Sequence, residues 1–124
     1  MKTLLLTSLL LLAPADALRA GGAEGAPVAE IVTFRLAAGV SEGEFLSAVR
    51  ATEGFVEAAP GFVSRRLSRG EDGTWTDHVE WASMDQAMAA AEALMADPTA
   101  LPFLMAIDPD SIAMRHETLV MRMD

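Results

Sequence analysis

Residues 74–83 read TWTDHVEWAS, and this stretch decides the fold. Its odd positions are mostly apolar and its even positions are polar, with Asp77 as the exception. A period of two with large aromatic residues predicts a half-buried strand, with one face on a core and the other free for polar groups. The apolar set is Trp75, Val79 and Trp81, and the polar set is Thr76, His78 and Glu80.

Two capping boxes place the helices of the chain. In each, a serine is followed three residues later by Glu or Gln, at 41–44 (SEGE) and at 83–86 (SMDQ). Turn residues at 71–73 (EDG) join two strand patterns and predict a hairpin. The expected helices cover 42–59 and 84–96, with a short helical turn within 100–107, and the expected strands cover 28–37, 62–69, 74–83 and 111–123.

The resulting order β-α-β-β-α-β predicts an α+β, ferredoxin-like fold, an antiparallel four-stranded sheet with two helices on one face. Four strands of about six residues expose roughly 400 Å² on the other face, judged from strand spacing and rise. A monomer rarely leaves an apolar patch of that size open. We therefore expect a homodimer that covers this second face.

The amino terminus has the pattern of a secretory signal peptide. Lys2 precedes an apolar run at 4–13, and Ala-Asp-Ala at 15–17 offers a cleavage site. The run is too short to span a bilayer, although an uncleaved anchor is the alternative. We expect a signal peptide at 1–17, a flexible segment at 18–27 and a domain at 28–124, in a protein that is exported to the periplasm or secreted.

Composition excludes several classes of function. The formal net charge is −9, and cleavage after residue 17 removes one basic and one acidic residue, so this charge is unchanged. Such a chain is repelled by nucleic acids and by anionic membranes, and we expect neither partner nor stable membrane insertion after cleavage. The sequence has no cysteine, which excludes disulfides, thiolate metal sites and a cysteine nucleophile.

Three segments resemble the antibiotic biosynthesis monooxygenase-like proteins, which are dimeric α/β barrels. They are EIVTFRLAAGVSEGEFL at 30–46, PGFVSRRL at 60–67 and EDGTWTDHVEWAS at 71–83. The resemblance extends over 29–123, and its motifs are the element order, the Pro-Gly before the second strand and the tryptophan before a serine cap.

The resemblance implies that two protomers join their sheets into one barrel. A small-molecule ligand would then lie between sheet and helices, or in the barrel lumen. Family members include cofactor-free oxygenases of aromatic polyketides, haem-degrading oxygenases and proteins without established activity. One hypothesis is thus a cofactor-independent monooxygenase acting on a small aromatic molecule. The alternative is a non-catalytic dimeric module that binds a small ligand or serves in a stress response.

Haem chemistry is disfavoured by the second helix. Trp81 matches in position the tryptophan that haem-degrading relatives place near their cofactor. Those relatives ligate the iron with a helix histidine, but residues 84–108 contain no histidine, and the first strand has no asparagine. We therefore expect no cofactor, and Trp81 serves equally well as core packing.

The two histidines are the leading candidates for chemistry. His78 and Glu80 lie two residues apart, on one face of the third strand, where a carboxylate can orient an imidazole. His116 in the last strand can approach His78 across the first strand if the last strand has the matching parity, which its sequence leaves open. Short ligand spacing such as H-x-x-x-H is lacking, so we expect no metal site. The candidate catalytic residues are His78, His116, Trp81 and Glu80, and the candidate substrate-binding residues are Arg35, Arg66 and Thr33.

Overall fold

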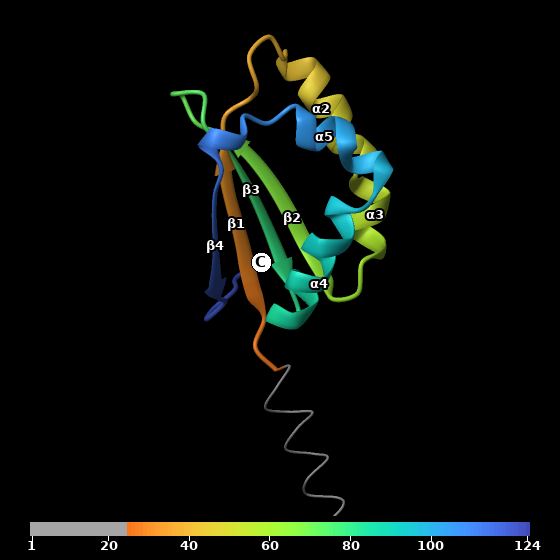
Figure 1. Ribbon diagram of the computed structural model, residues 1–124. Coiled ribbons are helices and arrows are strands. Elements are labelled where there is room, and N and C mark those ends of the chain that lie inside the picture. Colours follow the sequence, from red (N-terminus) through yellow and green to blue (C-terminus); the bar gives the residue numbers. More distant parts are fainter. Residues whose placement is uncertain (1–24) are drawn as a thin grey trace, which may run out of the picture.

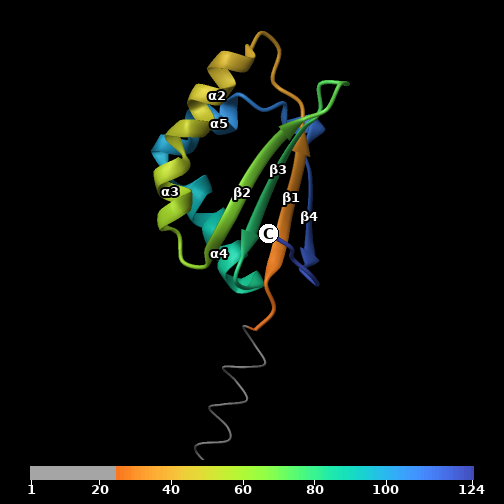
Figure 2. The same ribbon diagram turned by 180° about the vertical axis from the view of Figure 1, so that it is seen from behind.

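A computed structural model describes residues 25–124 of the chain, so the expected signal peptide at 1–17 lies outside the described residues. The strands form one antiparallel sheet in the order β2-β3-β1-β4. The helices all lie against one face of it, and Figures 1 and 2 show this two-layer arrangement from opposite sides. The elements are β1 (Val28–Phe34), α2 (Glu42–Ala51), α3 (Glu53–Ala58), β2 (Phe62–Arg69), β3 (Trp75–Trp81), α4 (Met84–Met95), η1 (Pro98–Ala100), α5 (Leu101–Met105), η2 (Pro109–Ser111) and β4 (Ala113–Thr118).

This architecture confirms the α+β, ferredoxin-like prediction and corrects several boundaries. β1 ends at Phe34 rather than residue 37, and Leu36 makes an isolated bridge to Ile107. β4 ends at Thr118, and the rest of the expected last strand is an irregular segment. None of the helices within residues 25–124 has the length and apolar character needed to cross a bilayer.

The first expected helix is divided into α2 and α3 at Thr52. The hydroxyl of Thr52 donates to the carbonyl of Val49 at 2.6 Å and accepts from Nη1 of Arg65 at 3.0 Å. A threonine hydroxyl that bonds back to a helix carbonyl competes with the helical ladder and bends the helix. Thr52 is 1% exposed, so this break is a buried contact between the helices and the sheet.

The core lies between the sheet and the helices. Phe45 of α2 is fully buried and makes edge contacts with Phe34 and Trp75, with ring centroids 5.6 and 4.8 Å apart. A second group surrounds Trp81, whose ring meets Phe62 at 6.0 Å. Trp75, Val79 and Trp81 all face the helices, as the period-two pattern of residues 74–83 predicts.

The turns and caps follow the local sequence signals. Gly61 and Gly73 have φ values of 89° and 86°, which permit the tight connections before β2 and β3. Both halves of the capping box form at Ser41 and Glu44. The pKa of Glu44 is lowered, mainly because its carboxylate accepts a hydrogen bond from the backbone N–H of Ser41. The pKa of Asp72 is lowered mainly by the backbone N–H of Thr74 in the same way.

The first capping box gives a direct test of this local account. Ser41→Ala removes the hydroxyl that accepts from the N–H of Glu44 at 3.1 Å. We expect a loss of about 1 kcal/mol in the free energy of unfolding, measured by urea denaturation. Ser47→Ala, an exposed position in the same helix, is the control and should change stability by less than about 0.5 kcal/mol. Equal effects at both positions would contradict a specific role for the cap.

Candidate functional site

Strand register determines which polar groups meet the helices. Across the sheet, His116 of β4 is opposite Glu30 of β1, Glu30 is opposite Val79 of β3, and Val79 is opposite Arg65 of β2. Because side chains alternate along a strand, this whole row points to the helix side, together with Asp77 two residues before Val79. Four titratable side chains therefore lie on the buried face of the sheet.

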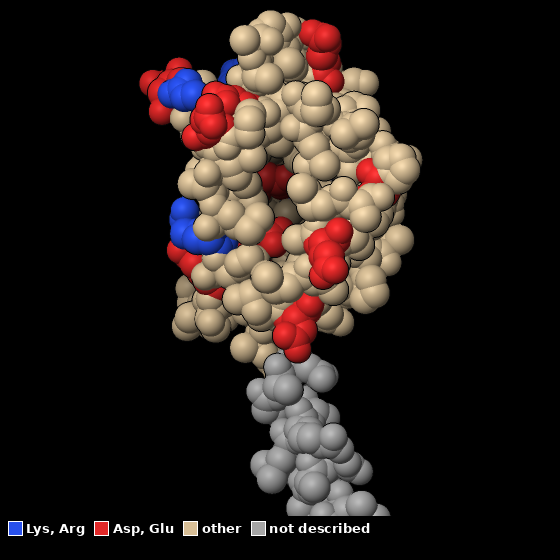
Figure 3. Space-filling model, in the orientation of Figure 1, with Lys and Arg blue, Asp and Glu red and all other residues tan. Residues whose placement is uncertain are grey.

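A cavity of about 200 Å³ opens between this face and the helices. Figure 3 looks into its opening, where acidic atoms are visible inside a hollow whose immediate edge is largely uncharged, with acidic side chains to its lower right and basic ones to its left. The acidic residues that line the cavity are Glu30 and Asp77. The remaining lining is mostly apolar, and includes Val32, Phe34, Val56, Val79, Trp81, Leu94, Met95, Phe103, Leu104, Ile107 and Met114.

Glu30 and His116 form one polar pair at this cavity. Nε2 of His116 lies 2.9 Å from Oε2 of Glu30, and the two side chains are 14% and 11% exposed. When Glu30 is ionised its oxygen only accepts, and the imidazole of His116 is then the donor through Nε2. Glu30 lines the cavity and His116 lies behind it on the edge strand, so the carboxylate is the group that a ligand would meet.

Arg65 and Asp77 form the second polar pair. Nε and Nη2 of Arg65 donate to the two carboxylate oxygens of Asp77 at 3.0 and 2.7 Å, a bidentate geometry. The guanidinium also bonds Thr52 and lies 5.7 Å from the ring centre of Phe103. These contacts fix the arginine on one wall of the cavity and balance its charge with that of Asp77.

The open face holds most of the residues that sequence reasoning selected. His78 is opposite Ile31, whereas His116 is opposite Glu30, so the two histidines lie on opposite faces of the sheet and cannot share a pocket. Thr33, Arg66 and Glu80 lie on the same open face as His78. The approach of His78 to His116, which depended on the parity of the last strand, therefore does not occur.

The expected pairing of His78 with Glu80 is also wrong. Nη2 of Arg122 donates to the carboxylate of Glu80 at 2.6 Å, and Nδ1 of His78 is buried without a hydrogen-bond partner among the described residues. Arg35 lies beyond the end of β1, where its guanidinium donates to the carbonyl of Asp72. Of the selected residues, only Trp81 lines the cavity, and His116 reaches it through Glu30.

Sequence reasoning missed Glu30, Arg65 and Asp77. The signal that could have found them is Asp77, a carboxylate on the apolar side of its strand. A buried charge requires a partner, so Asp77 by itself predicts a basic side chain on the same face. Arg65 adjoins Arg66 in the sequence, and adjacent residues of a strand point to opposite faces, so the local sequence does not say which of the two faces the helices. Within residues 25–124, no group of three His, Asp or Glu side chains is arranged to hold a metal ion.

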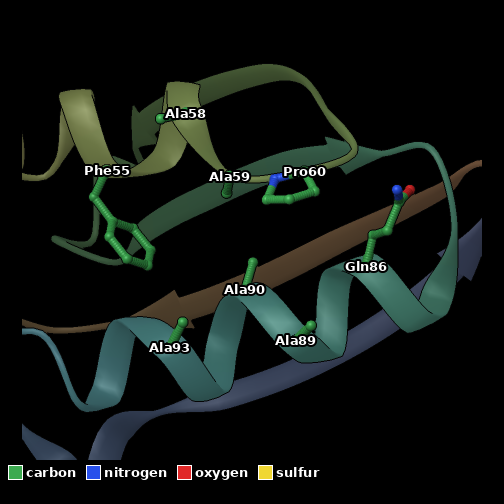
Figure 4. Close-up of a pocket in the computed structure, with 8 residues that line it drawn as sticks. All are labelled: Phe55, Ala58, Ala59, Pro60, Gln86, Ala89, Ala90 and Ala93. Carbon is green, nitrogen blue, oxygen red and sulfur yellow. The ribbon is translucent and has the colours of Figure 1, made fainter.

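A larger depression lies between α3 and α4, but it carries no titratable group. Its volume is about 410 Å³, and Figure 4 shows small side chains on both of its walls. The lining residues are Phe55, Ala58, Ala59, Pro60, Gln86, Ala89, Ala90 and Ala93. Binding there could be apolar, but general acid–base chemistry needs the residues of the smaller cavity.

Solved structures with the same fold are found in several organisms, although no protein-family model and no curated protein sequence matches this chain. SnoaB, a cofactor-independent oxygenase from Streptomyces nogalater, is 24% identical, with 81% of this chain and 97% of that chain covered at a TM-score of 0.55. A proposed antibiotic biosynthesis monooxygenase from Bordetella bronchiseptica is 18% identical, with coverages of 77% and 99% and a TM-score of 0.66. The chain has the antibiotic biosynthesis monooxygenase-like fold.

A third solved structure bears on assembly. It is a dimeric ferredoxin-like protein of unknown function from Thermobifida fusca YX, 11% identical, with coverages of 78% and 94% and a TM-score of 0.62. At these identities the likeness is one of fold. The antibiotic biosynthesis monooxygenase-like architecture thus confirms the resemblance drawn from residues 30–46, 60–67 and 71–83.

The buried Arg65–Asp77 pair gives a test of the site's construction. Asp77→Leu leaves the guanidinium without its counter-charge, and we expect a loss of about 3–5 kcal/mol in the free energy of unfolding. Adding Arg65→Met removes the buried guanidinium that has lost its counter-charge, so the double variant should be clearly more stable than Asp77→Leu alone.

Urea denaturation of the two variants measures this recovery. Glu117→Leu is the matched control, because the Arg115–Glu117 pair is more than half exposed and is worth about 1 kcal/mol or less. If Arg65→Met restores none of the free energy of unfolding lost in Asp77→Leu, the buried guanidinium does not need Asp77 as its counter-charge.

Proposed function

We propose that the protein is a cofactor-independent monooxygenase that oxidises a small phenolic molecule in the cavity between the sheet and the helices. The observation that carries this proposal is the Glu30–His116 pair, a buried carboxylate and imidazole 2.9 Å apart beside an apolar cavity. The fold shared with SnoaB, a cofactor-independent oxygenase, supports it.

The proposed chemistry needs only a base and an enclosed site. Without a cofactor, the substrate itself must give electrons to O₂, and a phenolate gives them more readily than a phenol. Glu30 would accept the phenol proton, and His116 would stabilise and orient the carboxylate through its Nε2–H. The apolar walls would exclude water, which strengthens these charge interactions.

The reaction balances with 1-naphthol as substrate. The naphtholate passes one electron to O₂, and the radical and superoxide combine at C4 to form a peroxide, which takes up the proton. Glu30 then removes the C4 proton, the O–O bond breaks, and the leaving hydroxide recovers that proton as water. The sum is naphthol plus O₂ giving 1,4-naphthoquinone plus water, with all four electrons transferred to O₂.

The size of the cavity suits a molecule with one or two rings. A dry cavity of about 150 Å³ is enough to bind benzene in an engineered protein. The cavity here is about 200 Å³ and is lined by Phe34, Trp81 and Phe103, whose rings provide aromatic surface. The cavity lining contains two carboxylates, Glu30 and Asp77, and one guanidinium, Arg65, so negative charge is in excess. A neutral phenol therefore fits this cavity better than a carboxylate ligand does.

Glu30→Gln tests the proposed base. The substitution keeps the size of the side chain but removes its basicity, and we expect at least about a hundredfold lower rate of O₂ consumption with 1-naphthol. His116→Leu should also lower the rate, because Glu30 loses the imidazole that pairs with it. The rate is followed with an oxygen electrode and by the absorbance of the quinone.

His78→Leu is the matched control, because it changes the histidine of the open face, and its rate should equal that of the wild type. Full activity in Glu30→Gln would rule out the carboxylate as the base. If 1-naphthol binds the wild type without consuming O₂, the non-catalytic ligand-binding module remains the better description.

We also propose a homodimer formed through the open face of the sheet. The face is mostly polar, with residues such as Ser64, Arg66 and His78, and its apolar residues Ala29 and Ile31 are already buried. The apolar area exposed on this face is therefore smaller than the number of strands predicts. The support comes from the dimeric state of the Thermobifida fusca protein and from two buried polar atoms on this face, Oγ of Ser64 and Nδ1 of His78, that have no hydrogen-bond partner within residues 25–124.

Light scattering during size-exclusion chromatography tests the dimer. We expect a mass of two chains, and Arg66→Glu should shift the equilibrium toward one chain, because it places a carboxylate on the open face diagonal to Glu80 of the neighbouring strand. Arg50→Glu, on the exposed side of α2, is the control and should leave the mass unchanged. A single-chain mass for the wild type at micromolar concentration would contradict the proposal.

A further inference from the structure

Two methionines connect the inside of the cavity with the outer surface. Met95 of α4 and Met114 of β4 both line the cavity, yet they are 69% and 53% exposed. Leu104 of α5, which is half-buried, lines the cavity as well. The opening therefore lies between the edge strand and these two helices, and its rim is apolar.

The apolar rim extends along α4. Met84, Met88, Ala91 and Met95 follow one another at spacings of four, three and four residues, which places them on one side of the helix. Ala91 and Met95 line the cavity, so this side points toward the opening, and Met88 is 55% exposed one turn away. We call Met88, Met95 and Met114 the methionine rim.

Exposed apolar side chains gathered around an opening indicate a binding surface. In Figure 3 the immediate edge of the hollow consists largely of uncharged side chains, and the charged side chains lie farther from the opening. Methionine is flexible and polarisable, and it adapts to apolar groups of varied shape. This surface is therefore suited to apolar contact and not to steering a charged ligand.

The cavity is smaller than most ligand sites. Its volume is about 200 Å³, whereas typical small-molecule pockets hold about 300–1,000 Å³. A ligand larger than one or two rings must extend through the opening. The first surface that its outer part meets is the methionine rim.

We propose that the ligand is a neutral phenol with an unbranched apolar chain, its ring beside Glu30 and its chain across the methionine rim. This inference rests on the proposed function, because it assigns the ring to the same cavity. It adds the substrate class: a lipophilic, chain-bearing phenol rather than a compact one. The chain gains affinity in proportion to the apolar surface that it buries against Met95 and Met114.

The test is a binding series of 3-alkylphenols with methyl, propyl, pentyl and heptyl chains, measured by isothermal titration calorimetry on the full chain. Each methylene that is buried tightens binding by about fourfold, and partial burial on the rim by about twofold. We expect the dissociation constant to fall steadily along the series for the wild type. A dissociation constant that does not change with chain length would overturn the proposal.

The double variant Met95→Ser, Met114→Ser replaces the two methionines of the rim that line the cavity and leaves Glu30 unchanged. Both residues line the cavity, so the readout is the slope of affinity against chain length and not the affinity for 3-methylphenol, and we expect the gain per methylene to be largely lost. Met123→Ser is the matched control, a methionine that is 85% exposed on the carboxyl-terminal segment. It should keep the wild-type slope, and equal slopes in all three proteins would exclude the rim.

Two further outcomes separate the possible explanations. If the double variant changes the mass in solution instead of the slope, the rim is a contact between copies of the chain and the proposal is wrong. Failure of the proposed oxygenase would be visible separately, as binding of the series with no O₂ consumed from 1-naphthol. A dependence of affinity on chain length without turnover would still establish the chain-binding rim.

Discussion

The register of β1 between β3 and β4 is the constraint on which the site depends. In an antiparallel sheet a shift by one residue moves every side chain of a strand to the other face. The observed pairing puts Glu30 opposite His116 and Ile31 opposite His78. One histidine is thereby buried beside a carboxylate under the helices, and the other is left on the open face.

Burial then determines what the polar groups must do. Charged side chains under a helical layer lose their hydration and need partners. Arg65 and Asp77 satisfy each other through two hydrogen bonds, and Thr52 takes a third from the arginine at the break between α2 and α3. The same network that ends α2 therefore holds one wall of the cavity. Stability and site geometry depend on one set of contacts in this part of the molecule.

The unequal coverage of the sheet accounts for the position of the opening. Helices α4 and α5 leave β4 at the free edge, so the cavity opens beside this strand. Along α4 the cavity is lined first by the small Ala90 and Ala91 and then by the longer Leu94 and Met95. A gradient from small to large side chains along one helix is thus part of what shapes the hollow.

The sequence by itself determined the element order, both helix caps, the hairpin turn and the buried face of residues 74–83. These follow from local patterns: serine caps, glycine turns and a period of two. It could not determine the site, because β4 has apolar and polar residues on both faces, so the parity of His116 depends on pairing with β1. Only the tertiary structure brought Glu30 to His116 and Arg65 to Asp77, since each pair joins different strands, and burial against the helices turned ordinary charged residues into a candidate site.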